Sequence, residues 1–183
     1  IPRLCYHPKL STEGACRVCV VEVKGMRNYA PACATKVTKD MEITTQSQDI
    51  HETRRDIVEL LLDNHPRACL TCERNGNCEL QNLAYTMGVR ERLYEGERKR
   101  FPIEASSCSV IRDSEKCVLC KRCVRVCAEV QGVYNLHQQH RGVKTVVTPA
   151  FEQDMTESIC INCGQCINVC PTASLIETRN TDD

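Results

Sequence analysis

Two runs of closely spaced cysteines constrain this chain more than any other feature of its sequence. Residues 117–127 read CVLCKRCVRVC, and residues 160–171 read CINCGQCINVCP. The second run has the spacing C-x2-C-x2-C-x3-C-P, and the first matches it except that Ala128 stands in the place of Pro171. Apolar residues recur with the cysteines in the pairs Val118 and Ile161, Val124 and Ile167, and Val126 and Val169. We therefore expect a duplicated half-domain with pseudo-twofold symmetry.

This spacing is typical of bacterial ferredoxins that hold two [4Fe–4S] clusters. Three cysteines on one turning loop can take three corners of a cluster, while the fourth, carried into the following helix, points towards the other cluster. Each run is therefore expected to complete the site of its partner. One predicted site consists of Cys117, Cys120, Cys123 and Cys170, and the other of Cys127, Cys160, Cys163 and Cys166.

The composition decides between iron and the other uses of cysteine. Sixteen cysteines, two Phe and no Trp in 183 residues argue against one large apolar core and favour small lobes. Disulfides fit poorly, because neighbouring cysteines in the runs are too crowded to pair without leaving orphans. Zinc prefers isolated tetrahedral sets such as two CxxC pairs. Iron–sulfur clusters therefore rank first for residues 117–170, in a reducing and cytoplasmic setting.

A different cysteine pattern opens the chain. One cysteine, a close pair and a distant fourth are the layout of a [2Fe–2S] site. The candidate ligands are Cys5, Cys16, Cys19 and Cys33. The ten residues between the first two depart from plant-type spacing, so a structural zinc site stays open as the alternative. Strands are expected over residues 18–23, ended by a Lys24-Gly25 turn, and over residues 41–45.

The clearest predicted helix spans Asp49 to Asn64. Asp49 can cap it, with Glu52 three residues later as in a capping box, and Pro66 ends it. Its predicted buried face consists of Ile50, Ile57, Leu60 and Leu61. A second amphipathic helix is expected to end at Gly88, with one side formed by Leu80, Leu83, Ala84 and Met87.

Between these helices stands a motif with three cysteines and a histidine, His65-x3-Cys69-x2-Cys72-x5-Cys78. A histidine beside a proline is more often a turn or capping residue, and HxxxCxxC also suits zinc. We favour a [4Fe–4S] cluster with His65 as its fourth ligand, because the neighbouring region already commits to such clusters. An imidazole in place of a thiolate removes negative charge and should raise the potential, as in Rieske centres.

The remaining segments carry weaker signals. Residues 91–101 read as a charged, solvated connector, and short strands are expected over residues 134–137 and 145–147. Cys108 is left over once the other cysteines are assigned, and is expected to be a small buried hydrophobe. His137 and His140 read as surface or loop residues.

Several function classes are disfavoured. Lys plus Arg and Asp plus Glu both number 24, and glutamates interrupt the basic stretch 90–100, so no nucleic-acid partner is expected. No signal peptide or membrane-spanning run is visible. There is no GxGxxG or Walker motif among only eight glycines, so we expect no bound nicotinamide or flavin and no cofactor beyond the clusters. No catalytic residue is expected in the chain.

Together, these motifs in this order resemble the N-terminal accessory region of [FeFe]-hydrogenases, especially the large subunits of multimeric NAD(P)-linked enzymes. The resemblance covers essentially the whole chain. It implies an α+β fold with a β-grasp [2Fe–2S] lobe at residues 1–47, whose N-terminal strands are absent from this chain. A small helical [4Fe–4S] lobe with one histidine and three cysteine ligands would follow at 48–104, and a two-cluster ferredoxin-like lobe at 105–183.

The resemblance implies one [2Fe–2S] and three [4Fe–4S] clusters that relay single electrons in an oxidoreductase. The electrons would pass between a downstream hydrogen-activating cluster and flavin- and NAD(P)-binding subunits, a thioredoxin-like [2Fe–2S] subunit or ferredoxin, within a hetero-oligomer. Large subunits of NAD-dependent formate dehydrogenases share this front end. The complex I large subunit is similar through Cys78, but usually has one all-cysteine cluster where this chain has two. A zinc-binding structural module is the alternative from another class.

Overall fold

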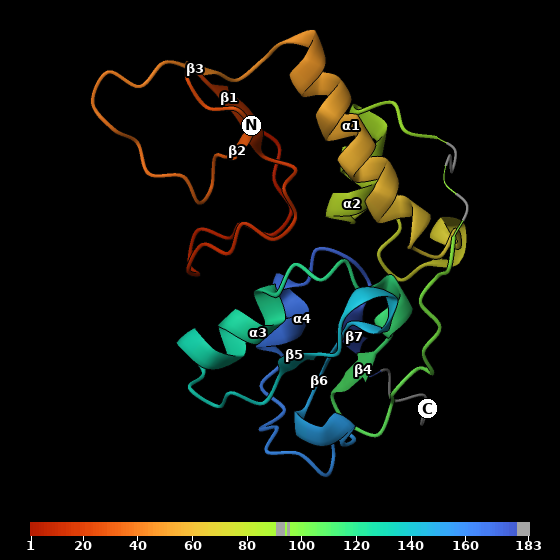
Figure 1. The fold of residues 1–183 in the computed structure, drawn as a ribbon. Helices are drawn as coiled ribbons and strands as arrows, with labels where there is room; N and C mark the ends of the chain where they lie inside the picture. The colour runs from red at the N-terminus through yellow and green to blue at the C-terminus, as the bar shows by residue number, and fades with distance from the viewer. Residues whose placement is uncertain (91–93, 95, 179–183) are drawn as a thin grey trace.

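The structure, a computed structural model, describes residues 1–90, 94 and 96–178 (Figure 1). Within these residues the chain forms three small antiparallel sheets, one long helix and several short helical turns. The strands are β1 (Val20–Val23), β2 (Ala30–Pro31), β3 (Ile43–Thr44), β4 (Val110–Arg112), β5 (His137–Gln139), β6 (Val146–Thr148) and β7 (Leu175–Glu177). The α-helices are α1 (Gln48–Asp63), α2 (Glu79–Thr86), α3 (Arg122–Arg125) and α4 (Gln165–Val169). Short 3-10 helices, which are tighter than an α-helix, are η1 (Cys69–Thr71), η2 (Ser114–Lys116), η4 (Gly142–Lys144) and η5 (Ala150–Glu152). A wider π-helical turn is η3 (Val126–Val130).

The first sheet has the order β2-β1-β3 and confirms the two strands expected in this part of the chain. The strand predicted over residues 18–23 is β1, whose three valines are buried while Glu22 is exposed. The strand predicted over residues 41–45 is β3. The predicted turn after β1 is also confirmed, because Gly25 has a φ of +87°, which glycine adopts without a steric penalty.

Helix α1 confirms the clearest helix prediction but corrects its cap. The N-cap is Ser47, whose Oγ accepts a hydrogen bond from the amide of Ile50 at 3.2 Å, and Asp49 lies in the first turn instead. The predicted buried face is wrong at Leu60, which is 55% exposed. The reason is helical geometry: Val58 is fully buried, and residues two apart lie on different faces of a helix.

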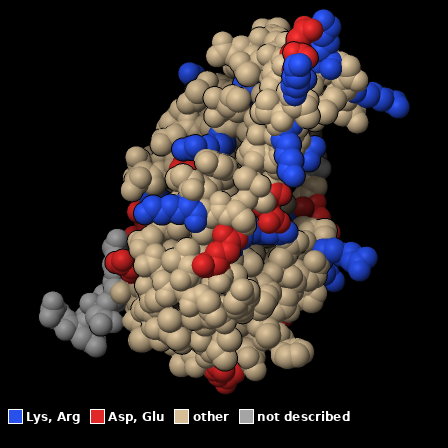
Figure 2. All heavy atoms as spheres, turned by 90° about the vertical axis from the view of Figure 1, so that its left-hand side faces the viewer, with Lys and Arg blue, Asp and Glu red and all other residues tan. Residues whose placement is uncertain are grey.

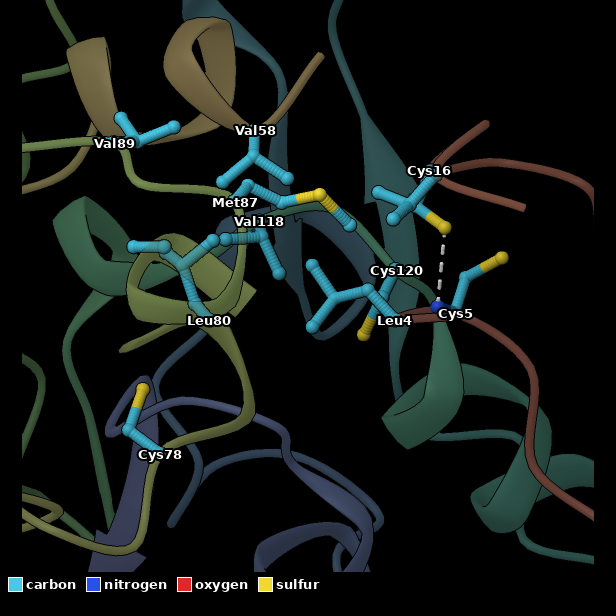
Figure 3. Close-up of a cluster of buried hydrophobic side chains, with 12 residues drawn as sticks. Leu4, Cys5, Cys16, Val58, Cys78, Leu80, Met87, Val89, Val118 and Cys120 are labelled. Carbon is cyan, nitrogen blue, oxygen red and sulfur yellow. Dashed lines mark hydrogen bonds between the residues drawn. The ribbon is translucent and has the colours of Figure 1, made fainter. Parts of the chain in front are cut away.

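An apolar core joins the N-terminal segment, α1, α2 and the first cysteine run (Figure 3). Leu4 comes from the N-terminal segment, Val58 from α1, Leu80 from α2 and Val118 from the run, and all are buried. Four of the residues buried in this core are cysteines, namely Cys5, Cys16, Cys78 and Cys120. Helix α2 ends as predicted at Gly88, which has a φ of +68°. The N-terminal, helical and C-terminal parts of the chain therefore share one apolar core.

The two cysteine runs fold alike, as the internal repeat predicts. In each run the residue two positions after the first cysteine has a left-handed backbone, with a φ of +54° at both Leu119 and Asn162. Each run then enters its helix through a second such residue, Lys121 before α3 and Gly164 before α4. Their ends differ, because α3 continues into the wide turn η3, whereas α4 stops before Pro171, which has no amide hydrogen to donate.

The sheets of the last lobe are only partly as predicted. The strands expected over residues 134–137 and 145–147 lie slightly later in the chain, as β5 and β6, which pair antiparallel. Strands β4 and β7, which the sequence did not predict, also pair antiparallel. These strands surround the second large apolar cluster, which includes Val110, Leu136, Val147 and Leu175.

The connector is not the fully solvated segment that its charges predict. Residues 91–93 and 95 lie outside the described residues, but Lys99 is buried and its ammonium donates to the carbonyl of Cys117 at 2.8 Å. On the face shown in Figure 2, positive and negative side chains are interspersed, and the lower part is largely uncharged. Among the described residues, none of the helices is both long and apolar enough to cross a membrane.

Candidate metal centres

A cavity of about 420 Å³ in the last lobe is walled by cysteines from two distant parts of the sequence. Three belong to the loop and first turn that open α3, and the fourth is the residue that caps α4. These cysteines are Cys117, Cys120, Cys123 and Cys170. They are the same four that the sequence assigns to one [4Fe–4S] cluster, and we call them the third site.

A second cavity, of about 380 Å³, holds the other crossed set. Its cysteines are Cys127, Cys160, Cys163 and Cys166, which we call the fourth site. The crossing follows from the packing of α3 and η3 against α4. Cys127 lies in η3 and Cys170 caps the end of α4, so each reaches the loop of the other run. The structure thus brings together the two predicted sets without mixing them.

Backbone amides point at cysteine sulfurs in these cavities. The amide of Leu119 donates to Sγ of Cys117 at 3.4 Å, and the amide of Asn135 donates to Sγ of Cys127 at 3.3 Å. The left-handed backbone of Leu119 helps to aim its amide into the loop. Hydrogen bonds to sulfur favour thiolate, which is the form that binds iron, and they tune cluster potentials.

The four cysteines near the N-terminus also lie in one neighbourhood, which we call the first site. The amide of Cys5 donates to Sγ of Cys16 at 3.3 Å (Figure 3). A separate hydrogen bond between the two thiol groups lowers the pKa of Cys5 to about 5 and raises the pKa of Cys16. Burial and, next, a hydrogen bond with Cys19 raise the pKa of Cys33 to about 11, and Cys5 adds to this effect.

The second site combines the buried Cys78 with the half-buried Cys69 and Cys72. Burial raises the pKa of Cys78, and nearby Cys72 and Cys69 raise it further. His65 is buried just after α1 and shares the wall of a cavity of about 1100 Å³ with Cys69. Cys72 and Cys78 do not line that cavity. The structure therefore brings the three cysteines near one another and places His65 on the side of Cys69.

Burial keeps most of these thiols in their neutral form when no metal is bound. It raises the pKa of Cys120 and of Cys166 to about 12 each, and it also raises the pKa of Cys123 well above its usual value. It also raises the pKa of Cys117, against the effect of the Lys99 ammonium. Because iron binds thiolates, filling these sites must release protons.

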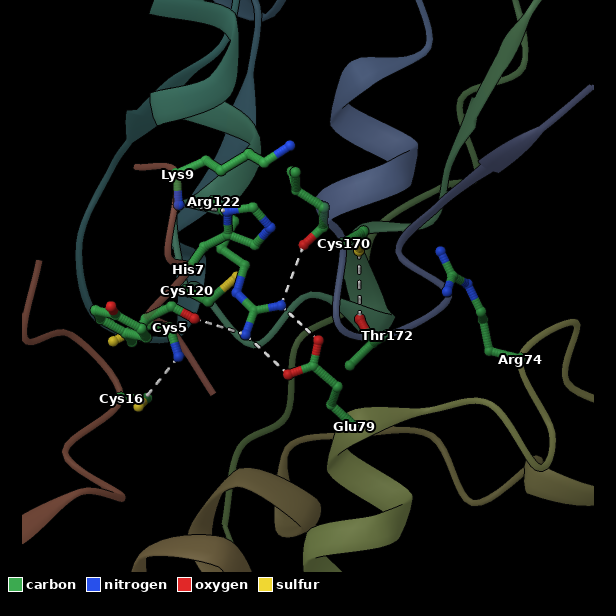
Figure 4. Close-up of polar contacts among 12 residues, drawn as sticks. Cys5, His7, Lys9, Cys16, Arg74, Glu79, Cys120, Arg122, Cys170 and Thr172 are labelled. Carbon is green, nitrogen blue, oxygen red and sulfur yellow. Dashed lines mark hydrogen bonds and ion pairs between the residues drawn. The ribbon is translucent and has the colours of Figure 1, made fainter. Parts of the chain in front are cut away.

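Two buried arginines inside the first cysteine run were not predicted from the sequence. Arg122 donates to both carboxylate oxygens of Glu79, at 2.5 and 2.8 Å, and to the carbonyl of Tyr6 at 2.9 Å (Figure 4). Arg125 donates to the carbonyls of Cys5 and Cys120. The available signal was the comparison of the repeats, because the equivalent positions of the second run hold neutral Gln and Asn.

Arg122 lies where three candidate sites meet. Tyr6 follows a cysteine of the first site, Glu79 follows a cysteine of the second, and the carbonyl of Val169, which Arg122 also contacts at 3.4 Å, precedes a cysteine of the third. The backbone adds a direct link, since the amide of Glu79 donates to the carbonyl of Pro171 at 3.0 Å. The third site is therefore in contact with the segments that carry the first and second sites.

The prediction for Cys108 is wrong. Its side chain is exposed. The hydroxyls of Ser107 and Ser109, on either side of it, donate to the side chain of Asn162 in the fourth-site loop. Cys108 therefore lies near Cys160 and helps to raise its pKa. The surface prediction for His137 and His140 is confirmed. His137 is exposed in β5, and His140 is exposed and contacts Glu152.

The donor sets fit iron–sulfur clusters by their chemistry. Each crossed cavity offers four thiols with an amide donor to sulfur, and the buried Arg112 also lines the cavity of the third site, which suits a negatively charged cluster. Among the described residues, no group of three or more His, Cys, Asp or Glu side chains is placed to hold one metal ion.

Three family models match successive parts of the chain. A 2Fe-2S iron-sulfur cluster binding domain matches residues 1–48, and the NADH-ubiquinone oxidoreductase-G iron-sulfur binding region matches residues 54–92. A 4Fe-4S dicluster domain matches residues 116–174. The chain thus combines [2Fe–2S] and [4Fe–4S] domains in a small α+β fold.

Relatives align with nearly the whole chain. The NADP-reducing hydrogenase subunit HndD of Solidesulfovibrio fructosivorans is 46% identical over 97% of this chain and 31% of its own length. The G 2 subunit of NADH-quinone oxidoreductase from Rhizobium meliloti is 36% identical over 96% of this chain and 20% of its own length. The alpha subunit of NADPH-Fe(3+) oxidoreductase from Geobacter sulfurreducens is 37% identical over 96% of this chain and 20% of its own length. The chain therefore spans about a fifth to a third of these relatives.

A solved structure has the same fold. It is an NAD+-reducing [NiFe]-hydrogenase in the H2-reduced state, which superposes with a TM-score of 0.90 at 27% sequence identity. The superposition covers 98% of this chain and 76% of that chain.

Proposed function

Because the chain belongs to the iron–sulfur region shared by the G-type subunits of NADH-quinone oxidoreductase and the HndD-like subunits of NADP-reducing hydrogenase, we propose that it is the electron relay of an NAD(P)-linked hydrogenase. The hydrogen-activating centre of the whole enzyme, of the [FeFe] type, lies outside this relay. The observation that carries the proposal is the pair of cavities walled by the crossed cysteine sets.

The relay holds one [2Fe–2S] and three [4Fe–4S] clusters. The first site takes the [2Fe–2S] cluster in a β-grasp lobe at residues 1–47, and the second site, with His65 as its fourth ligand, takes a [4Fe–4S] cluster in the helical lobe at 48–104. The third and fourth sites take the other two [4Fe–4S] clusters in a ferredoxin-like lobe at 105–183. Buried cysteines, aimed amides and the imidazole of His65 support this assignment.

The clusters supply one-electron chemistry, and the residues of this chain fix their spacing and tune their potentials. The third site is the junction of the relay. Its support is the set of contacts that join its loop to the segments of the first and second sites, through Arg122, Arg125 and Pro171. Electrons from two entry sites can converge there before they reach the fourth site.

The same relay in a complex I-like large subunit is the second candidate, and the NADH-quinone oxidoreductase relatives favour it directly. A formate dehydrogenase subunit is the third. The zinc-binding module has no support from the family models, which all describe iron–sulfur regions. We place the relay in a cytoplasmic hetero-oligomer with flavin- and NAD(P)-binding and thioredoxin-like [2Fe–2S] subunits, or with ferredoxin as partner.

Two measurements on the full-length protein, purified without oxygen, test the proposal. The segment should contribute about fourteen irons per chain by cluster stoichiometry, whereas about half that content together with bound zinc would overturn the assignment of the first two sites. Reduction of the clusters is then followed under hydrogen, NADH or formate. A hydrogenase relay is reduced by hydrogen, and reduction by NADH or formate alone identifies the second or third candidate.

A further inference from the structure

A single side chain touches both the first and the third site. Nη2 of Arg125 donates to the carbonyl of Cys5 at 2.7 Å and to the carbonyl of Cys120 at 3.2 Å. Cys5 belongs to the first candidate site and Cys120 to the third. One nitrogen atom thus connects cysteines that are far apart in the sequence and that belong to different candidate clusters.

The other donors of Arg125 hold the same two segments. Nη1 donates to the carbonyl of Ser11, in the loop between Cys5 and Cys16, and Nε donates to the carbonyl of Lys121 at 3.3 Å. The guanidinium is buried, with 6% of the residue exposed. All its hydrogen-bond acceptors in the described part of the chain are backbone carbonyls.

Its charge distinguishes Arg125 from its neighbour. Arg122 forms an ion pair with Glu79, so much of its charge is compensated locally. No carboxylate of the described residues forms an ion pair with Arg125. Its charge helps to lower the pKa of the exposed Glu129, but two hydrogen bonds from Ser11 lower that pKa more. A buried cation without a paired anion is costly unless another negative charge lies close by.

We propose that Arg125 is a positioning residue that clamps the first site against the third and raises the reduction potentials of the clusters in both. This inference rests on the proposed function, because it takes both sites to hold iron–sulfur clusters. A cluster bound by thiolates is negative, and it becomes more negative on reduction. The buried charge of Arg125 therefore favours the reduced state of each, through surroundings that screen charge less than water does.

The matched variants separate charge from shape. Arg125→Gln removes the charge but keeps an amide donor, and Arg125→Lys keeps the charge. Arg3→Gln is the control, because Arg3 is also close in sequence to Cys5 but is exposed and stacks over the ring of Tyr6 at 5.0 Å. Each variant is made in the full-length protein, and potentials are measured by redox titration with electron paramagnetic resonance.

In Arg125→Gln we expect the potentials of the [2Fe–2S] cluster and of one [4Fe–4S] cluster to fall together. Arg125→Lys should restore both potentials, and Arg3→Gln should leave them at their wild-type values. Unchanged potentials in Arg125→Gln, or a shift confined to one cluster, would overturn the inference. If Arg125→Gln assembles no clusters, failure of Arg125→Lys to give wild-type potentials overturns it. Absence of these clusters from the wild-type protein would instead refute the proposed function.

Discussion

Arg122 and Glu79 form a two-pronged ion pair, with N–O distances of 2.5 and 2.8 Å, between the first cysteine run and the start of α2. The arginine side chain is only 5% exposed, whereas that of the glutamate is 46% exposed. The pair therefore joins the helical lobe to the last lobe at the edge of the solvent.

Glu79→Gln should lower the free energy of unfolding by about 1–3 kcal/mol, because it leaves the buried Arg122 with a weaker acceptor. Removing one partner of a fully buried pair costs about 3–5 kcal/mol, but water can reach the exposed side of this site. Chemical denaturation of the wild type and the variant measures the difference. Arg122→Met combined with Glu79→Gln completes a double-mutant cycle, and a coupling energy of zero would contradict the pairing.

Replacing the last cysteine of either run should damage the cluster held mainly by the other run. In Cys170→Ser we expect the signal of the cluster bound by the first run to change, while Cys127→Ser should change the signal of the cluster bound by the second. The cause is the crossed lining of the two cavities. Mössbauer spectra of the two variants provide the test, and damage to the cluster of the same run would contradict the crossing.

His65→Ala should remove or alter the signal of one [4Fe–4S] cluster and leave the other three unchanged. His65→Cys is the informative companion, since a fourth thiolate adds negative charge and should lower the potential of that cluster while keeping it assembled. Electron paramagnetic resonance during a redox titration distinguishes these outcomes. Wild-type spectra and potentials in both variants would show that His65 is not a cluster ligand and has only a structural role at the end of α1.

Two cations that contact the first sheet offer a matched test of how it is held. Arg54 of α1 is buried and donates to the carbonyl of Val20 in β1 at 2.7 and 3.1 Å, whereas Lys24, just after β1, makes an exposed pair with Glu42. Arg54→Met should cost about 1–3 kcal/mol by leaving that carbonyl without its donor. Lys24→Met should cost only about 0.2–1 kcal/mol. Denaturant titration compares them, and equal costs would contradict a special role for Arg54.

The features predictable from sequence are those encoded over short distances. The spacing of Cys117, Cys120 and Cys123 defines a loop with its own backbone geometry, and the same loop recurs in the second run. The helices likewise follow from local periodicity and stop signals, although the sequence favours Asp49 as the cap of α1 and the structure has Ser47. Serine and aspartate are similarly good N-cap residues, so the sequence alone does not decide which of Ser47 and Asp49 caps the helix.

Features that depend on distant segments were not predictable. Strands β4 and β7 are three residues each and stabilise each other across most of the last lobe, so neither has a periodicity of its own. The repeat also loses its symmetry in context. Val118 is buried in the core that it shares with α1 and α2, while its equivalent Ile161 lies outside that core and is 58% exposed.

The shared core of Leu4, Val58, Leu80 and Val118 has a consequence for how the protein matures. A ribosome delivers Leu4 first, but the apolar surroundings that bury it are incomplete until Val118 has emerged. We therefore expect the N-terminal lobe to stay open during translation and to close late. The cysteines of the first site would then stay accessible to iron and sulfide until Val118 completes the core around them.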